Sequence, residues 1–444
     1  MFDVCVIGGG PAGSALALRL ARLGRRVALI EKASSRARCS VEALTGAVLP
    51  LLDVLGIPGD IAEGIFVPVP RTTLQWAGRL ENQRLGTAYL VRRNAFDSVL
   101  LRAAMHSGVF VKQPTRVTDS KFDGRWSLKL DSGDVLHARY LADATGRSGF
   151  VSGKKTAIGI QTIALFADWY GVDPQDGSML VEAGTSEWFW GAPLPGGTFS
   201  AAVFLDAKRA RKYRYRELIR SSNLLAERLA NGICGSIRAC DATSFVDQTP
   251  VTDRFIKVGE AVLSIDPLSS QGVQIAMGTA LHSAAVLNTI IDRPHNASLA
   301  AEFYRRRIYD YSTFHALAAA RLYRDHYEAM GGHFWQERSG ASVPNQPSKS
   351  ELLLHQYVRI ADRVSFVLVP TIADRYVVET DGIELNGSLY ACINGLNVAH
   401  LLRTINQPTK AARIVDKWSR FTSQAVAAKI LQWAWREGLL VMTT

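Results

Sequence analysis

At roughly 100–200 residues per domain, the 444 residues of this chain predict two or three domains. Hydrophobic residues make up 48% and charged residues 20% of the sequence, which excludes a mainly disordered chain and a coiled coil. Lys and Arg number 51 and Asp and Glu number 40, giving a net charge of +11. This excess suits an acidic partner, a nucleic acid or an anionic cofactor, without selecting between them.

The cysteines and the N-terminus indicate a reducing compartment. The five cysteines are scattered and lack CxxC spacing, so we expect small core residues instead of a disulfide framework or a zinc site. Residues 1–7 lead straight into a glycine motif, which argues against a secretory signal and for a cytoplasmic protein. Residues 267–291 reach membrane-spanning length but carry polar side chains, so we expect a buried helix preceded by a loop and no membrane span.

The first 31 residues have the pattern of a β-α-β unit. Residues 2–7 form an apolar run, residues 14–23 show helical periodicity that ends at Gly24, and residues 26–30 form a second apolar run. The remaining elements follow from the same kind of pattern: a loop at 89–91, a helix at 96–105, a hairpin-like pair at 126–130 and 135–140, strands of a separate sheet within 160–206, and helices within 281–329. The last ninety residues mix short helices and strands, and their fold is not predicted.

A GxGxxG motif at residues 8–13 follows the first strand and opens the helix. Gly8 permits a tight turn, Gly10 lets the backbone reach a pyrophosphate, and Gly13 lets the helix and the strand pack closely. Glu31 ends the second strand at nearly the spacing at which a carboxylate accepts hydrogen bonds from the adenosine ribose. The motif predicts a dinucleotide site but does not distinguish NAD from FAD.

Two later segments resemble those of flavoprotein hydroxylases. Residues 142–148 (Ala-Asp-Ala-Thr-Gly-Arg-Ser) resemble their second dinucleotide-binding stretch, and residues 258–273 resemble their third, so that the resemblance covers roughly the first 330 residues. In that family an acid of the third segment holds the ribityl chain, and the loop from Pro to Gly wraps the flavin ring. Glu260 stands where the family usually has Asp, which shifts the geometry but keeps a carboxylate. The resemblance therefore implies FAD.

A physical argument also favours binding of a flavin by the loop before Gly272. Gly272 opens an apolar helix, whose free N–H groups and positive end would stabilise the negative charge of a reduced flavin. The resemblance further implies an arginine beside FAD and a backbone segment beside the adenine. The expected cofactor-binding residues are Gly8, Gly10, Pro11, Ala12, Gly13, Glu31, Lys32, Arg93, Val117, Asp143, Gly146, Glu260, Pro267, Gln271, Gly272 and Val273.

The reaction must be inferred from what surrounds the flavin. Residues 188–193 (Trp-Phe-Trp-Gly-Ala-Pro) resemble the WxWxIP signature of flavin-dependent halogenases, with Ala192 in place of Ile. Without that resemblance, an aromatic strand is commonly core packing. No catalytic residue is assigned; the candidates near flavin and substrate are Trp188, Trp190, Ser270 and Gln271.

A halogenase also needs a lysine to capture the hypohalous acid formed from the flavin hydroperoxide and halide. In that family the lysine lies shortly before a stretch like residues 73–76, but residues 64–72 contain none. Arg71 cannot replace it, because a guanidinium stays protonated. Only the fold could bring another lysine, such as Lys112 or Lys257, to the site. We therefore expect an FAD-dependent monooxygenase that hydroxylates an electron-rich aromatic substrate through a flavin hydroperoxide, with a halogenase and a non-catalytic flavin-bound assembly module as alternatives.

The halogenase-like scaffold without the lysine resembles a sub-group that modifies tryptophan inside a protein, in the biogenesis of tryptophylquinone cofactors. An acidic protein or peptide substrate would be steered by the charge of +11, and a free or a carrier-bound aromatic metabolite is the alternative. Electrons would come from NAD(P)H or from a partner flavin reductase. No motif indicates a nucleic acid or a metal ion.

The expected fold class is α/β: a Rossmann-type FAD-binding domain interleaved with a mixed β-sheet substrate domain, plus a small C-terminal α/β domain. The FAD-binding domain is expected at 1–65, 90–155 and 250–290, and the substrate domain at 66–89 and 156–249. A helical segment at 291–350 and the C-terminal domain at 351–444 complete the chain.

Overall fold

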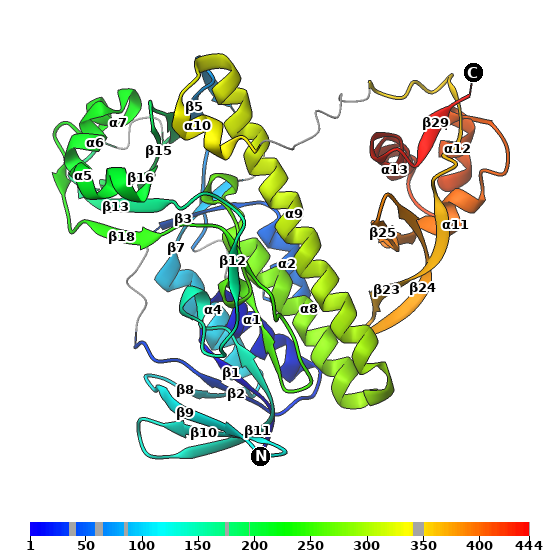
Figure 1. Ribbon diagram of the computed structural model, residues 1–444, viewed down its shortest axis with the longest axis horizontal. Helices are drawn as coiled ribbons and strands as arrows, with labels where there is room; N and C mark the ends of the chain where they lie inside the picture. Colours follow the sequence, from blue (N-terminus) through cyan, green and yellow to red (C-terminus); the bar gives the residue numbers. More distant parts are fainter. Residues whose placement is uncertain are drawn as a thin grey trace. The chain divides into compact units, whose positions relative to one another are not determined.

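The computed structural model describes residues 1–34, 41–57, 65–83, 88–173, 177–194, 196–340 and 350–443 (Figure 1). The chain divides into two compact units. The first contains residues 1–288 and 304–343, and the second contains residues 289–303 and 344–444. Each unit has its own hydrophobic core.

The first unit opens with the predicted β-α-β arrangement. The strand β1 (Phe2–Ile7) leads into the helix α1 (Pro11–Arg22), and β2 (Val27–Ile30) returns parallel to β1. On its other side β1 pairs in parallel with β11 (Val135–Asp143), and β11 pairs with β20 (Phe255–Lys257). The remaining strands of this sheet are β8 (Phe110–Lys112), β9 (Val117–Phe122) and β10 (Trp126–Leu130). The predicted hairpin is confirmed, because β10 and β11 are antiparallel neighbours.

A second, mixed sheet follows the order β17-β13-β16-β15-β14-β5-β6, with β18 also paired to β13. Its strands are β5 (Thr72–Trp76), β6 (Arg79–Gln83), β13 (Ile163–Tyr170), β14 (Met179–Ala183), β15 (Glu187–Leu194), β16 (Thr198–Leu205), β17 (Ile233–Cys234) and β18 (Arg238–Asp241). The separate sheet expected within residues 160–206 is confirmed, and together with the dinucleotide sheet it gives the predicted α/β class.

Helices cover both faces of this mixed sheet. The short helices α5 (Ala207–Lys212), α6 (Tyr215–Ser221) and α7 (Asn223–Arg228) lie over one face, as Figure 1 shows. The other face packs against α9 (Ala297–Met330) and α10 (His333–Arg338). Because side chains of a strand alternate between faces, β15 contributes Phe189 to the first of these cores and Trp188 to the second.

Residues 88–92 differ from the expectation of a loop. They form the strand β7 (Ala88–Arg92), which pairs with β3 (Val41–Thr45) and β4 (Val67–Pro68). This strand was missed because its partners lie far away in the sequence. The helix that follows, α4 (Arg93–His106), packs against α1.

The long helix α8 (Gly272–Asp292) follows a 3-10 turn, η3 (Pro267–Ser269), which confirms the expected loop and buried helix. By length and composition α8 could cross a membrane, but 78% of its most apolar window is buried inside the structure, as in a core helix. A short 3-10 turn at residues 294–296 separates α8 from α9.

The second unit is a small α/β structure, as expected for the C-terminal domain. Its longest strands, β23 (Ser365–Ala373) and β24 (Tyr376–Leu385), form an antiparallel pair. The helices α11 (Val398–Arg403), α12 (Ala411–Trp418) and α13 (Gln424–Glu437) contribute to a core that contains the fully buried Trp418.

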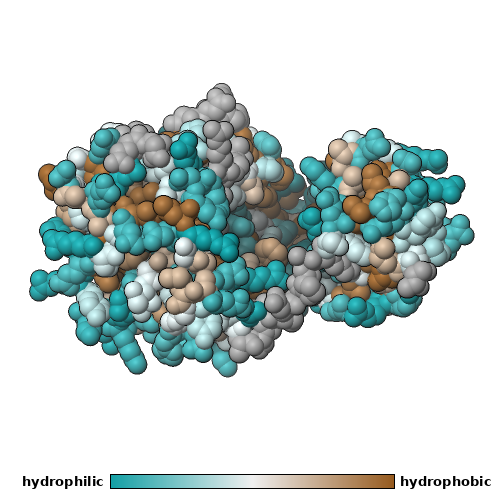
Figure 2. Space-filling view, turned by 90° about the horizontal axis from the view of Figure 1, so that it is seen from above, coloured by the Kyte–Doolittle hydropathy of each residue, from teal (hydrophilic) through white to brown (hydrophobic). Residues whose placement is uncertain are grey.

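The surface carries more polar side chains than the cores, and on the face drawn in Figure 2 hydrophobic residues form only small patches. The expectation of buried cysteines is correct for Cys5 only. Cys234 is half-buried, and Cys240 and Cys392 are exposed, because they lie on short strands whose side chains face solvent. Cys39 lies outside the described residues.

Candidate flavin site

The glycine motif forms the turn between β1 and α1. Gly8 has a φ of +107°, and a Cβ atom there would lie 2.3 Å from the carbonyl oxygen of Ala144. A Cβ atom on Gly13 would lie 1.8 Å from the carbonyl oxygen of Gly8. Gly10 is the N-cap of α1, Pro11 and Ala12 follow it, and no side chain caps the first turn. The turn therefore requires glycine and leaves backbone N–H groups at the positive end of the helix, which fits a pyrophosphate.

Glu31 is buried at the end of β2 and connects that end to the glycine turn. Its Oε2 accepts a hydrogen bond from the backbone N–H of Gly9 at 2.6 Å, and its Oε1 accepts one from Ala33 at 2.9 Å. The neighbouring Lys32 is exposed. A carboxylate has about four acceptor positions, so this residue type in this place fits a bond from a ribose hydroxyl.

The segment that precedes Val117 lies beside Glu31, because the backbone N–H of Thr115 donates to the carbonyl oxygen of Glu31 at 2.8 Å. Val117 itself begins β9, and its side chain is buried in the core of the first sheet. Val117 is therefore suited to contact an adenine through its backbone only.

Asp143 ends β11 with a fully buried side chain that faces the protein. Its carboxylate accepts hydrogen bonds from the N–H and the hydroxyl of Thr145, at 3.0 and 2.7 Å. It also accepts from the N–H groups of Phe150 and Val151, at 2.7 and 2.8 Å. Four donors hold the carboxylate of Asp143 inward, and these hydrogen bonds fix the turn around Gly146. The backbone at the start of that turn lies against Gly8.

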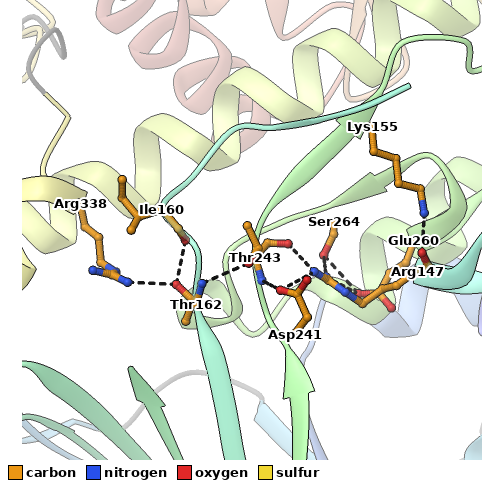
Figure 3. Close-up of polar contacts among 9 residues, drawn as sticks. All are labelled: Arg147, Lys155, Ile160, Thr162, Asp241, Thr243, Glu260, Ser264 and Arg338. Atoms are coloured by element: carbon orange, nitrogen blue, oxygen red, sulfur yellow. Dashed lines mark hydrogen bonds and ion pairs between the residues drawn. The ribbon is translucent and has the colours of Figure 1, made fainter. Parts of the chain in front are cut away.

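Glu260 lies on the turn after β20, with 48% of its side chain exposed. Its Oε1 accepts a hydrogen bond from the Ser264 hydroxyl at 3.2 Å and lies 3.6 Å from Nη1 of Arg147. Arg147 also donates to the carbonyl oxygen of Thr243 at 2.5 Å, and Figure 3 shows how the contacts continue from Thr243 to Arg338. Arg147 was not among the expected site residues, although its place in the 142–148 motif was a signal for it.

The loop before α8 and the first turn of that helix bring five expected residues together. Pro267 begins η3, Ser270 has a left-handed φ of +50°, and Gln271 directly precedes Gly272. A Cβ atom on Gly272 would meet nothing within 4 Å, so the N-terminus of α8 faces open space, while Val273 is buried. This arrangement fits the ring of a flavin beside the helix end.

Arg93, the first residue of α4, lies between two carboxylates. Its Nη1 is 3.1 Å from Oε2 of Glu42, and its Nε is 3.3 Å from Oδ1 of Asp97. Burial raises the pKa of Glu42, and the neighbouring Arg93 opposes that shift. Glu42 was not among the expected site residues, because no motif includes it.

The strand β15 contacts the loop of residues 267–271, which we call the flavin loop, through an aromatic cluster. Trp188 is buried and stacks on Phe204, with ring centroids 3.8 Å apart. Leu268, from the flavin loop, packs against the same cluster, which also contains Tyr323 of α9. Trp190 is half-buried and packs against this cluster and against the neighbouring core around Val41. The candidates Trp188 and Trp190 therefore lie on one face of β15, toward Leu268.

Both lysines considered as possible halogenase relays are paired with carboxylates. Lys257 is 2.7 Å from Oδ2 of Asp247, and both side chains are only 1% exposed. Lys112 forms an ion pair with Asp134 at the edge strand β8. Gly64, in the segment that lacks a lysine, lies outside the described residues, whereas Pro68 belongs to β4.

Comparisons with known proteins show the family to which this chain belongs. The sequence model of the family described as "FAD binding domain" matches residues 1–288. The tryptophan 2-halogenase of Chondromyces crocatus is 30% identical over 352 residues, which are 72% of this chain and 67% of the relative.

Two solved structures cover nearly all of the chain. The peptidyl tryptophan dihydroxylase QhpG, described as essential for tryptophylquinone cofactor biogenesis, has a TM-score of 0.75 at 26% identity and covers 99% of each chain. The match to the flavin-dependent halogenase CmlS has a TM-score of 0.84 and covers 99% of this chain and 96% of the CmlS chain. At 18% identity, this match shows the fold alone. The chain therefore belongs to the FAD-binding domain family, within the superfamily of flavin-dependent monooxygenases and halogenases, and is an FAD-dependent oxidoreductase.

Proposed function

We propose that this protein is an FAD-dependent monooxygenase that hydroxylates an electron-rich aromatic substrate, namely a tryptophan within a protein during tryptophylquinone biogenesis. The observation that carries the proposal is the missing lysine relay. Residues 65–72 contain no lysine, and the amines of Lys257 and Lys112 are both paired with carboxylates. Direct oxygen transfer needs no protein nucleophile, whereas halogenation by a captured hypohalous acid does.

We propose the following contacts with the cofactor. The N–H groups after Gly10 bind the pyrophosphate, and Glu31 accepts bonds from the adenosine ribose. Glu260, oriented by Arg147 and Ser264, accepts a bond from the ribityl chain. The loop from Pro267 to Val273 borders the flavin ring, and FAD, when bound and reduced, supplies the activation of oxygen.

The aromatic cluster gives this chain a means of orienting an aromatic substrate. We propose that the half-buried Trp190 contacts the substrate ring and that the buried Trp188 supports it from behind, since both point to the face of β15 that meets Leu268. Aromatic rings in contact stabilise one another beyond the area that they bury. Likeness to a peptidyl tryptophan dihydroxylase over 99% of both chains supports a protein-bound tryptophan as the substrate.

A halogenase remains the second candidate, because the tryptophan 2-halogenase is 30% identical to this chain. One experiment distinguishes the two. The FAD-loaded protein is incubated with a flavin reductase, NADH, oxygen, bromide and a tryptophan-containing substrate protein, and the product is analysed by mass spectrometry. Products that gain only oxygen support the proposal, and products that gain bromine overturn it. If the FAD is reducible but neither product forms with any aromatic substrate, a non-catalytic assembly module is favoured.

The charge of the chain makes a separate contribution to the choice of substrate. A surface with a net charge of +11 attracts an acidic protein at low ionic strength, and salt screens this attraction. Binding of such a substrate should weaken steeply as salt rises. Binding that is independent of salt would favour a small neutral aromatic molecule.

A further inference from the structure

A groove of about 630 Å³ lies between the hairpin of β5 and β6 and the helix α9, within the first unit. Leu74 and Trp76 from β5 and Leu322 from α9 provide its apolar surface. The register of the hairpin pairs Leu74 with Glu81 and Trp76 with Arg79, so all four side chains point to the face that α9 covers. None of the described residues that line the groove is among the contacts proposed for FAD. Leu74 and Trp76 also belong to the aromatic cluster that Leu268 contacts, so the groove lies on the outer side of that cluster.

The apolar surface of the groove is held in place by two hydrogen bonds at the end of the hairpin. The indole N–H of Trp76 donates to the carbonyl oxygen of Leu322 at 3.0 Å. The backbone N–H of Ala77 donates to Nδ1 of His326 at 3.0 Å. The tip of the hairpin is thereby fixed on α9, so a ligand would find the groove already formed.

The polar lining of the groove is mainly acidic. Glu81, Asp325 and Glu328 are exposed, and within the described part of the chain none of them forms an ion pair with a lysine or arginine. Arg79 is the single basic residue among the described residues that line the groove. Three carboxylates against one guanidinium give the lining of this groove a net negative charge, in a chain of net charge +11.

The groove also borders the open edge of a sheet. β6 is the last strand in the order of the mixed sheet, and among the described residues no strand pairs with its outer side. Such an edge presents N–H and C=O groups that an extended segment of another chain can pair with. On the opposite face of β6 the side chain of Leu80 is 64% exposed, which offers an apolar contact on that side.

We propose that this groove binds an extended segment of a partner protein in which basic and apolar side chains alternate, and that the segment adds as a strand to β6. Its lysines or arginines would point toward α9, with their aliphatic stems over Leu322 and their charges near Glu81 and Glu328. Its apolar side chains would point to the other face, beside Leu80. The proposal concerns binding and does not depend on the reaction that the flavin performs.

The test measures the binding of a fluorescein-labelled peptide of alternating lysine and valine to the full chain by fluorescence anisotropy. We expect binding that weakens when the lysines of the peptide are replaced by glutamates. We also expect it to weaken when every second backbone amide is N-methylated, because the methyl groups block pairing with the edge of β6. A methylated peptide that binds as tightly as the parent would overturn the proposed strand addition.

The protein variants test the position of the site. The double variant Glu81→Lys/Glu328→Lys should weaken the affinity for the lysine peptide by about tenfold or more. The matched control Asp119→Lys/Asp123→Lys has the same change of charge on and after β9, the edge strand of the other large sheet, and should change the affinity much less. Circular dichroism shows whether both variants are folded. Equal effects of the two variants, or no binding to the unmodified protein, would overturn the proposal.

Discussion

The hydroxyl of Tyr323 donates to both carboxylate oxygens of Asp266, at 3.1 and 3.0 Å. The backbone N–H of Leu268 also donates to this carboxylate, at 3.0 Å. Asp266 directly precedes the flavin loop, and Tyr323 lies on α9, so the contact fixes the start of that loop against a helix. Burial raises the pKa of Asp266, while its hydrogen bonds and the more distant Arg338 act in the opposite direction.

The raised pKa of Asp266 predicts a dependence of stability on pH. The folded protein binds the proton of Asp266 more tightly than the unfolded chain does. This stabilising contribution is present below the unfolded pKa of about 3.9 and is lost as the pH rises through the higher folded pKa. We therefore expect Asp266→Asn to gain stability relative to the unmodified protein as the pH rises through that window. Urea unfolding of both proteins from acidic to neutral pH measures the difference, and a constant difference would contradict the prediction.

Removal of the Tyr323 hydroxyl should destabilise the first unit. Tyr323→Phe leaves the buried carboxylate of Asp266 with fewer donors, which is expected to cost about 1–3 kcal/mol at neutral pH. The matched control is Tyr309→Phe on the same helix, where the side chain is 62% exposed and the loss should be small. Unfolding in urea at pH 7 compares the two variants. Equal midpoints for both would show that the bond to Asp266 contributes nothing.

The glycine turn should not tolerate a side chain at Gly13. A Cβ atom there would lie 1.8 Å from the carbonyl oxygen of Gly8, so Gly13→Ala must displace the helix or the turn that leads to it. We expect the purified variant to lose its bound FAD, which is measured by its visible absorbance. Gly159→Ala is the control, because a Cβ atom at that position would make only ordinary contacts, at 3.5 Å from Ser244. A Gly13→Ala protein with full FAD content would refute this assignment of the pyrophosphate site.

Glu260→Ala should weaken the binding of FAD by about 1 kcal/mol, the cost of losing one hydrogen bond at a partly exposed site. Its side chain is 48% exposed, so a larger effect is not expected. Glu260→Asp keeps a carboxylate and should bind FAD more tightly than the alanine variant. Fluorescence titration of the apoprotein with FAD gives the affinities. If all three proteins bind FAD equally, the ribityl chain is held by other residues.

The parts of the site that could be predicted from the sequence depend on residues close together in the chain. The strand, glycine turn and helix of residues 2–22 are one local motif, and Glu31 ends the next strand. The hairpin of β10 and β11 is local too. In each case hydrophobic periodicity and turn-forming residues indicate the structure directly.

Only the tertiary structure decided how the acidic residues of the site are used. Asp143 and Glu260 both occur in family-like motifs, yet four donors turn the first carboxylate inward, whereas the second is half-exposed beside Arg147. The contact between Tyr323 and Asp266 joins residues 57 positions apart. Such hydrogen bonds form only when separate elements pack together. The direction of a carboxylate depends on the donors that this packing brings near it, and neither periodicity nor spacing along the chain contains that information.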